Sequence, residues 1–138
     1  MDPFDLSDYR ILIVDGNADS RTLTRQLLSD AGATQILETA TGQEAVKMLA
    51  GKPHIILTDI ETGPVSGIDL LKHIRALPNA LKNIVVVVFT AKNDADAVSR
   101  ALGCNADGYI IKPVTPASFR VLCAKSIRRN WHTRCSRT

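Results

Sequence analysis

The sequence has few aromatic residues and no long apolar run. Only 4% of its residues are aromatic, so we expect Val, Ile, Leu and Ala to fill the core. No stretch of about eighteen apolar residues occurs, which argues against a transmembrane helix. The first residues are acidic and lack the basic and apolar regions of a signal peptide, so we expect a cytoplasmic protein. Three cysteines without C-x-x-C spacing argue against a disulfide framework or a zinc ribbon.

Acidic residues are absent from the end of the chain. The overall net charge is only +3, yet from Pro116 onward there is no Asp or Glu. The basic residues there are Arg120, Lys125, Arg128, Arg129, Arg134 and Arg137. A mildly acidic domain therefore ends in a basic tail. This asymmetry predicts an anionic partner for the tail, such as nucleic acid, a nucleotide or a membrane surface.

Apolar runs of strand length alternate with segments of helical periodicity five times. We expect strands near 10–15, 34–38, 53–58, 84–90 and 107–111. The expected helices include one over Ser20–Ala31, with Leu23, Leu27 and Leu28 at helical spacing. The alternation predicts one doubly wound α/β domain with a parallel sheet in the order 2-1-3-4-5 and five flanking helices. Apolar periodicity stops near Asn130, so we expect a domain over 1–129, with its core over about 9–127, and an arginine-rich extension over 130–138.

Four polar residues stand at the carboxyl ends of predicted strands. They are Asp15, Asp59, Thr90 and Lys112. Because the carboxyl ends of parallel strands share one edge of a sheet, we expect these side chains to meet. Each alone is an ordinary strand-end residue, but together they suit phosphorylation of a carboxylate. A bound cation would neutralise phosphoryl oxygens, one carboxylate would attack, and the hydroxyl and ammonium groups would hold the new charge.

The surrounding motifs resemble those of CheY-type response-regulator receiver domains, whose fold is flavodoxin-like. The motifs are I-L-I-V-D at Ile11–Asp15, I-L-T-D at Ile56–Asp59, V-F-T-A at Val88–Ala91 and G-Y-I-I-K-P at Gly108–Pro113. The resemblance extends from about Tyr9 to Ile127. It implies two-component signalling rather than catalysis on a substrate.

The resemblance also implies a role for individual residues. Asp59 would be the phosphoacceptor, with Thr90 and Lys112 beside it and Tyr109 as a rotating switch. A magnesium ion would be held by Asp15, Asp59 and the backbone carbonyl of Glu61, and the Lys112–Pro113 peptide would be cis. Receivers usually carry two adjacent acids after the first strand, whereas this chain has Asp15 followed by Gly16. With one oxygen ligand fewer, magnesium should bind weakly.

The basic tail combines arginines with a single tryptophan. Arginine suits bidentate contacts to guanine or phosphate, and tryptophan offers a stacking face. An imperfect receiver with an arginine-rich end resembles the CheY-like cyclic di-GMP effectors, which engage the flagellar motor switch. That resemblance implies cyclic di-GMP as the ligand, recruitment to the flagellar base, and ligand contacts from Arg128, Arg129, Trp131, Arg134 and Arg137.

Two other interpretations follow from the same residues. One is a conventional phosphorelay receiver, switched by a histidine kinase through Asp59, in which the tail has no part. The other is a nucleic-acid or anionic-membrane binder acting through the tail arginines. The sequence has no P-loop, no Ser–His pairing and no HExxH motif, so we expect no enzyme. His132 and Cys135 are too few to predict a metal site in the tail.

Overall fold

The sheet has the predicted strand order. The computed structural model describes residues 5–92 and 94–134, with side chains as far as Arg129. Five strands pair in parallel in the order β2-β1-β3-β4-β5. They are β1 (Arg10–Val14), β2 (Gln35–Thr39), β3 (Ile55–Thr58), β4 (Val85–Thr90) and β5 (Gly108–Ile111). The flavodoxin-like fold expected from the sequence is confirmed.

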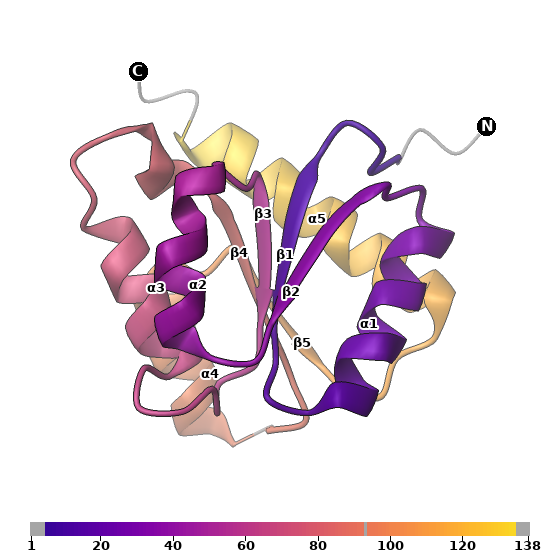
Figure 1. Cartoon of the computed structure of the whole chain (residues 1–138), viewed down its shortest axis with the longest axis horizontal. Helices are drawn as coiled ribbons and strands as arrows, with labels where there is room; N and C mark the ends of the chain where they lie inside the picture. Colours follow the sequence, from indigo (N-terminus) through magenta and orange to yellow (C-terminus); the bar gives the residue numbers. More distant parts are fainter. Residues whose placement is uncertain (1–4, 93, 135–138) are drawn as a thin grey trace.

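Helices cover both faces of this sheet. They are α1 (Ala18–Asp30), α2 (Gly42–Met48), α3 (Gly67–Arg75), α4 (Ala95–Gly103) and α5 (Pro116–Arg134), with short 3-10 helices η1 (Leu49–Gly51) and η2 (Ala80–Asn83). Figure 1 shows α1 and α5 on one side of the sheet and α2, α3 and α4 on the other. No helix in the described ranges is long and apolar enough to cross a membrane.

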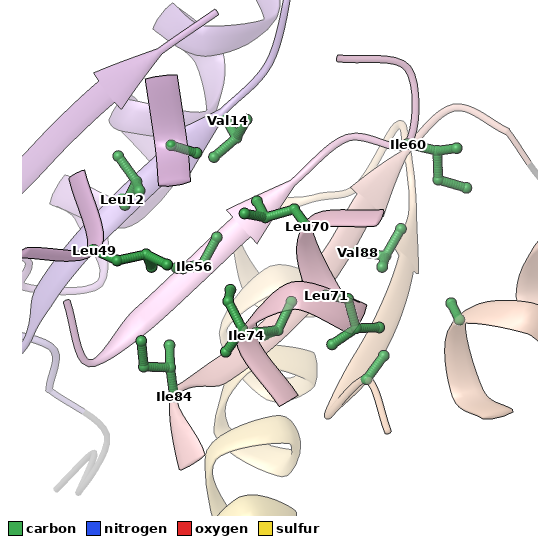
Figure 2. Packing of buried hydrophobic residues seen from close by; sticks show 14 of the residues in the cluster. Leu12, Val14, Leu49, Ile56, Ile60, Leu70, Leu71, Ile74, Ile84 and Val88 are labelled. Carbon is green, nitrogen blue, oxygen red and sulfur yellow. The ribbon is translucent and has the colours of Figure 1, made fainter. Parts of the chain in front are cut away.

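Two apolar layers form the core, one on each face of the sheet. Leu12 and Ile56 pack with Ile74 of α3 in the first layer, which Figure 2 shows from close by. Ile13 packs with Phe119 of α5 in the second layer. A parallel strand covered on both sides needs an apolar residue at nearly every position. This requirement explains why β1, β3 and β4 are continuous apolar runs in the sequence.

The first helix differs from its sequence prediction at its start and on its buried face. Asn17 caps the helix by accepting a hydrogen bond from Ser20 N at 2.9 Å, so the helix begins at Ala18 rather than Ser20. Leu28 is buried and Leu27 is half-buried, but Leu23 is 62% exposed. The polar Thr24 is buried instead, because its hydroxyl donates to Ser20 O within the same helix. The spacing of the leucines therefore predicted a buried face through Leu23, whereas the buried face of α1 passes through the next residue, Thr24.

The last helix continues beyond its apolar stripe. Phe119 and Cys123 are buried, whereas Arg128 and Arg129 are exposed. The backbone stays helical to Arg134, within the region predicted as an extension. Arginine is a good helix former, so the helix can continue without an apolar face. The predicted boundary at Asn130 stays a prediction, and residues 135–138 lie outside the described residues.

The Lys112–Pro113 peptide is cis, as the resemblance implied.

Protonation of His54 should weaken the fold at the start of the sheet. Its Nδ1 atom accepts a hydrogen bond from Arg10 N at 2.9 Å, and only a neutral imidazole can accept there. Partial burial and the charge of Arg10 lower the pKa of His54. The folded protein thus favours the neutral ring, and this stabilisation is present above about pH 6.5. It is lost as the pH falls through the lowered pKa.

Melting temperatures at about pH 7.5 and about pH 5.5 test this expectation. The wild type should lose more stability between these pH values than His54→Gln does. His73→Gln is the matched control, because His73 is exposed on α3 and should leave the wild-type pH dependence unchanged. An identical pH dependence in the wild type and His54→Gln would contradict the role assigned to this ring.

Candidate functional site

The four predicted strand-end residues meet in pairs at the carboxyl edge of the sheet. Thr90, the last residue of β4, donates from its Oγ1 to Asp59 Oδ1 at 2.5 Å. Lys112, which follows β5, donates from its Nζ to Asp15 Oδ2 at 2.9 Å. In the sheet order β5 is separated from β1 by β3 and β4, so the lysine side chain reaches across the edge. Strand-end placement alone therefore predicted that these four residues share one edge of the sheet, although it did not predict which of them pair.

Asp15 is buried, and its neighbours stabilise the ionised form of its carboxylate. Only 3% of the residue is exposed. Burial by itself would raise the pKa of Asp15, but hydrogen bonds from Ser20, Lys112 and the Asn17 N–H outweigh it and lower the pKa. Lys112 Nζ also donates to Ser20 Oγ at 2.5 Å and lies 4.9 Å from the centre of the Phe89 ring. The lysine ammonium is thus held between a carboxylate, a hydroxyl and an aromatic face.

Asp59 lies at the turn that leaves β3 and is half-buried. Its Oδ1 also accepts from Ile60 N at 2.6 Å. The turn is tight, because a Cβ atom at Gly67 would lie 2.1 Å from Asp59 O. Gly67 N donates to Ile60 O at 2.8 Å and fixes this close approach. The backbone therefore positions the Asp59 carboxylate beside Thr90 before any ligand arrives.

Tyr109 of β5 lies toward the loop that follows β4. Its hydroxyl donates to Lys92 O at 2.6 Å, and Lys92 N donates to Thr90 Oγ1 at 3.2 Å. Desolvation and the charges of Asp94 and Asp59 raise the pKa of Tyr109. A continuous series of hydrogen bonds thus connects Asp59, Thr90, Lys92 and Tyr109. The sequence analysis missed Lys92, which carries no recognisable signal beyond its position two residues after Thr90.

Two further polar contacts lie at the rim of the site. Lys92 Nζ lies 3.8 Å from a carboxylate oxygen of Glu61 and 3.9 Å from one of Asp94. Both acidic side chains are largely exposed, so solvent screens these pairs and they add little stability. The Glu61 carbonyl, a predicted metal ligand, faces Gly16: a Cβ atom at Gly16 would lie 3.9 Å from it.

The donor set does not make a strong magnesium site as it stands. Lys112 and the Asn17 N–H already engage both oxygens of Asp15, and Asp59 Oδ1 accepts two hydrogen bonds. Gly16 contributes no carboxylate. Within the described residues, no group of three or more His, Cys, Asp or Glu side chains could hold a metal ion. The wild-type pocket therefore has fewer free oxygen ligands than a tightly bound magnesium ion requires.

A five-stranded parallel domain with two acids, a threonine and a lysine at its carboxyl edge is the architecture of a signalling receiver. The chain belongs to the response regulator receiver domain family, whose model matches residues 11–123. It is similar to chemotaxis protein CheY-3 of Vibrio cholerae, with 35% identity over 88% of this chain and 94% of that protein. It is also similar to chemotaxis protein CheY of Pseudomonas aeruginosa, with 36% identity over 87% of this chain and 97% of that protein.

Solved structures agree with this assignment. The signal receiver domain of a signal transduction histidine kinase from Syntrophus aciditrophicus superposes with a TM-score of 0.75 at 28% identity, covering 91% of this chain and 92% of that chain. A putative response regulator from Chloroflexus aurantiacus gives a TM-score of 0.77 at 26% identity, covering 86% and 96% respectively. The receiver resemblance seen in the sequence is thereby confirmed.

The residues predicted to contact cyclic di-GMP are described in part. Arg128 and Arg129 lie on α5 and are exposed. Arg128 Nε donates to Ala124 O at 3.3 Å, so its side chain turns back along its own helix. The side chains of Trp131 and Arg134, and the whole of Arg137, lie outside the described residues. The ligand role of all five residues stays a prediction.

Proposed function

We propose that this chain is a chemotaxis-type signalling receiver in which the state of the Asp59 pocket is read on the surface around Tyr109. The contact between Thr90 Oγ1 and Asp59 Oδ1 carries this proposal. A change at the carboxylate alters a hydroxyl that also accepts from Lys92 N, and Lys92 O in turn holds the Tyr109 hydroxyl. A histidine kinase upstream and a flagellar motor switch protein downstream suit this role, which would place the chain in the cytoplasm.

The chemical event that we propose is transfer of a phosphoryl group to Asp59. A carboxylate oxygen of Asp59 attacks phosphorus, and the bond from phosphorus to the donor's leaving group breaks with its electron pair. The Thr90 hydroxyl, which now donates to Asp59, would then donate to a phosphoryl oxygen. The Lys112 ammonium pairs with Asp15 at the same edge of the sheet, and on leaving Asp15 it would supply positive charge to the phosphoryl group. Asp59, Thr90 and Lys112 are the side chains to which this proposal assigns a role in the transfer.

Asp59→Asn should abolish phosphoryl uptake without unfolding the domain, because the amide cannot attack phosphorus. The test incubates the full chain with acetyl phosphate and millimolar magnesium and measures the gain of one phosphoryl group by mass spectrometry. Beryllofluoride with magnesium should shift the amide resonances of Thr90 and Lys112 in the wild type but not in Asp59→Asn. Asp8→Asn, at an exposed carboxylate before β1, is the matched control and should behave as wild type. No uptake and no shift in the wild type would reject Asp59 as the input.

A second candidate input is cyclic di-GMP, bound through the basic end of α5. The specific observation is that α5 runs on past its apolar stripe and presents Arg128 and Arg129 to solvent. Two exposed guanidinium groups on the C-terminal part of α5 suit a ligand with two phosphates and two guanines. On this proposal the liganded protein engages the flagellar motor switch and so moves to the flagellar base.

Isothermal titration of the full chain should detect cyclic di-GMP binding on the micromolar scale. Arginine–guanine contacts contribute about 1–3 kcal/mol each, and the loss of rigid-body freedom on association offsets part of this gain. GTP, a single-stranded oligonucleotide and anionic lipid vesicles serve as comparison ligands. Equal binding of the oligonucleotide or the vesicles, with a steep loss in salt, would identify a nucleic-acid or membrane binder instead.

A further inference from the structure

We propose that the Lys112 ammonium, positioned by Ser20, takes the place of a divalent cation at Asp15 in the resting pocket. Lys112 Nζ donates to Asp15 Oδ2 at 2.9 Å and to Ser20 Oγ at 2.5 Å. An ammonium group on this carboxylate oxygen excludes a metal ion from the same oxygen, so the lysine and the metal compete. Ser20 is then a positioning residue, which affects metal binding through Lys112. The inference concerns the unphosphorylated pocket and does not depend on the proposed phosphoryl transfer.

Three polar side chains contact one another around this carboxylate. A serine hydroxyl can accept one hydrogen bond while it donates another. The Ser20 hydroxyl accepts from Lys112 Nζ and also hydrogen-bonds to the Asp15 carboxylate. The second carboxylate oxygen, Oδ1, accepts from Asn17 N at 2.9 Å. Both oxygens of Asp15 are therefore engaged, and a metal ion has to displace the ammonium in order to bind there.

Burial and an aromatic ring fix the position of the lysine side chain. The side chains of Lys112 and Asp15 are 20% and 5% exposed. Lys112 Nζ lies 4.9 Å from the centre of the ring of Phe89, which packs in the apolar layer on the α1 and α5 side of the sheet. Solvent screens a pair this sheltered much less than it screens the exposed pairs of Lys92. The ammonium is thus a permanent competitor for a metal ion.

The position of Ser20 in α1 explains why the lysine needs a hydroxyl there. Asn17 caps α1 by accepting from Ser20 N, so Ser20 lies in the first turn of the helix. The helix dipole presents partial positive charge at this end, which is unfavourable for an ammonium group unless oxygen atoms face it. Asp15 and Ser20 supply those oxygen atoms. Removal of the Ser20 hydroxyl should therefore loosen the lysine and leave the Asp15 carboxylate in place.

Magnesium titration of the unphosphorylated full chain, followed by the amide resonance of Gly16, tests the competition. Ser20→Ala should raise the affinity for magnesium about three- to tenfold, the effect of losing one hydrogen bond that holds the competing ammonium. Lys112→Gln, which removes the competing charge altogether, should raise the affinity at least as much. Ser29→Ala, at an exposed position of the same helix, is the matched control and should bind as the wild type does.

Two further variants show whether the serine acts through the lysine. Ser20→Thr keeps the hydroxyl and should bind magnesium as weakly as the wild type. Ser20 lines a groove of about 370 Å³ beside α1, which has room for the added methyl group. The double variant Ser20→Ala with Lys112→Gln should bind magnesium as Lys112→Gln alone does. Gains that add in the double variant would mean a direct effect of the serine on Asp15 and would overturn the positioning role.

The side-chain resonances of Lys112 provide a readout on the wild-type chain itself. In protein made with isotopically labelled lysine, the Cε protons of Lys112 should show a ring-current shift from Phe89, and Lys112→Gln assigns the signal by its loss. Saturating magnesium should reduce this shift in the wild type, and Ser20→Ala should reduce it without magnesium. Unchanged magnesium affinity in Ser20→Ala, or a Lys112 signal that magnesium leaves in place, would overturn the inference whether or not Asp59 accepts a phosphoryl group.

Discussion

Gly16→Asp should raise the affinity of the pocket for magnesium at least tenfold, roughly the effect of restoring a charged oxygen ligand. A Cβ atom at position 16 would lie 3.7 Å from Ala40 O and 3.9 Å from Glu61 O, which are ordinary contact distances. The backbone at Gly16 therefore accepts a side chain without displacing its neighbours. The new carboxylate would stand beside Asp15 and the Glu61 carbonyl, where it adds the hard oxygen that the wild-type pocket lacks. Phosphoryl uptake by Asp59 should accelerate in parallel.

Matched variants separate charge from shape at this position. Gly16→Ala adds only the Cβ atom, and Gly16→Asn adds an amide of the same size as the carboxylate but without its charge. Magnesium titrations followed by amide resonances should show tight binding for Gly16→Asp alone. A wild-type protein that already holds magnesium at low micromolar concentration would contradict the explanation, as would an equal gain from Gly16→Asn.

Arg75→Met should lower the free energy of unfolding by about 3–5 kcal/mol, because it leaves a buried carboxylate without its partner. The Arg75 guanidinium pairs with Asp107 at 2.9 Å and donates to the backbone carbonyls of Lys82, Ile84 and Asn105. The side chains of Arg75 and Asp107 are only 12% and 1% exposed. One side chain thereby joins the end of α3 to η2 and to the turn before β5.

Urea denaturation measures this loss. Arg100→Met, at an exposed position on α4, is the matched control and should change stability by less than about 0.5 kcal/mol. The double variant Arg75→Met with Asp107→Asn should be more stable than the sum of the single losses predicts, because the amide leaves no uncompensated charge. A loss below about 1 kcal/mol for Arg75→Met would mean that water replaces the guanidinium at little cost.

The strand pattern and the strand-end residues were predictable because both follow from burial on two faces of a parallel sheet. Apolar residues at every position of β3 and β4 except the last predict two buried strands, and Asp59 and Thr90 then have to lie at the same edge of the sheet. The partner of Lys112 could not be predicted in this way. Which of two nearby carboxylates the ammonium contacts depends on the path of its side chain past Phe89 and on the position of Ser20 in α1.

Helix boundaries and exposed helix faces were less predictable. Leu23 shares helical spacing with Leu27 and Leu28, but the buried face of α1 passes through Thr24, whose hydroxyl is satisfied by its own helix. The close contact between β5 and α5 has no counterpart in any motif. Gly108 and Ser126 lie against each other across 18 positions of sequence, which only the packing of α5 on β5 determines.

The position of Tyr109 has a thermodynamic consequence for any partner that binds beside it. Its hydroxyl belongs to the hydrogen bonds that lead through Lys92 and Thr90 to Asp59, and its side chain packs against the apolar layer on the α3 and α4 side of the sheet. If phosphorylation of Asp59 changes the position of Tyr109, it changes the affinity for a partner bound there by some factor, and linkage requires the partner to shift the phosphorylation equilibrium by the same factor. Measurement of either coupling therefore determines the other. A partner that reads the phosphorylated state would also stabilise it.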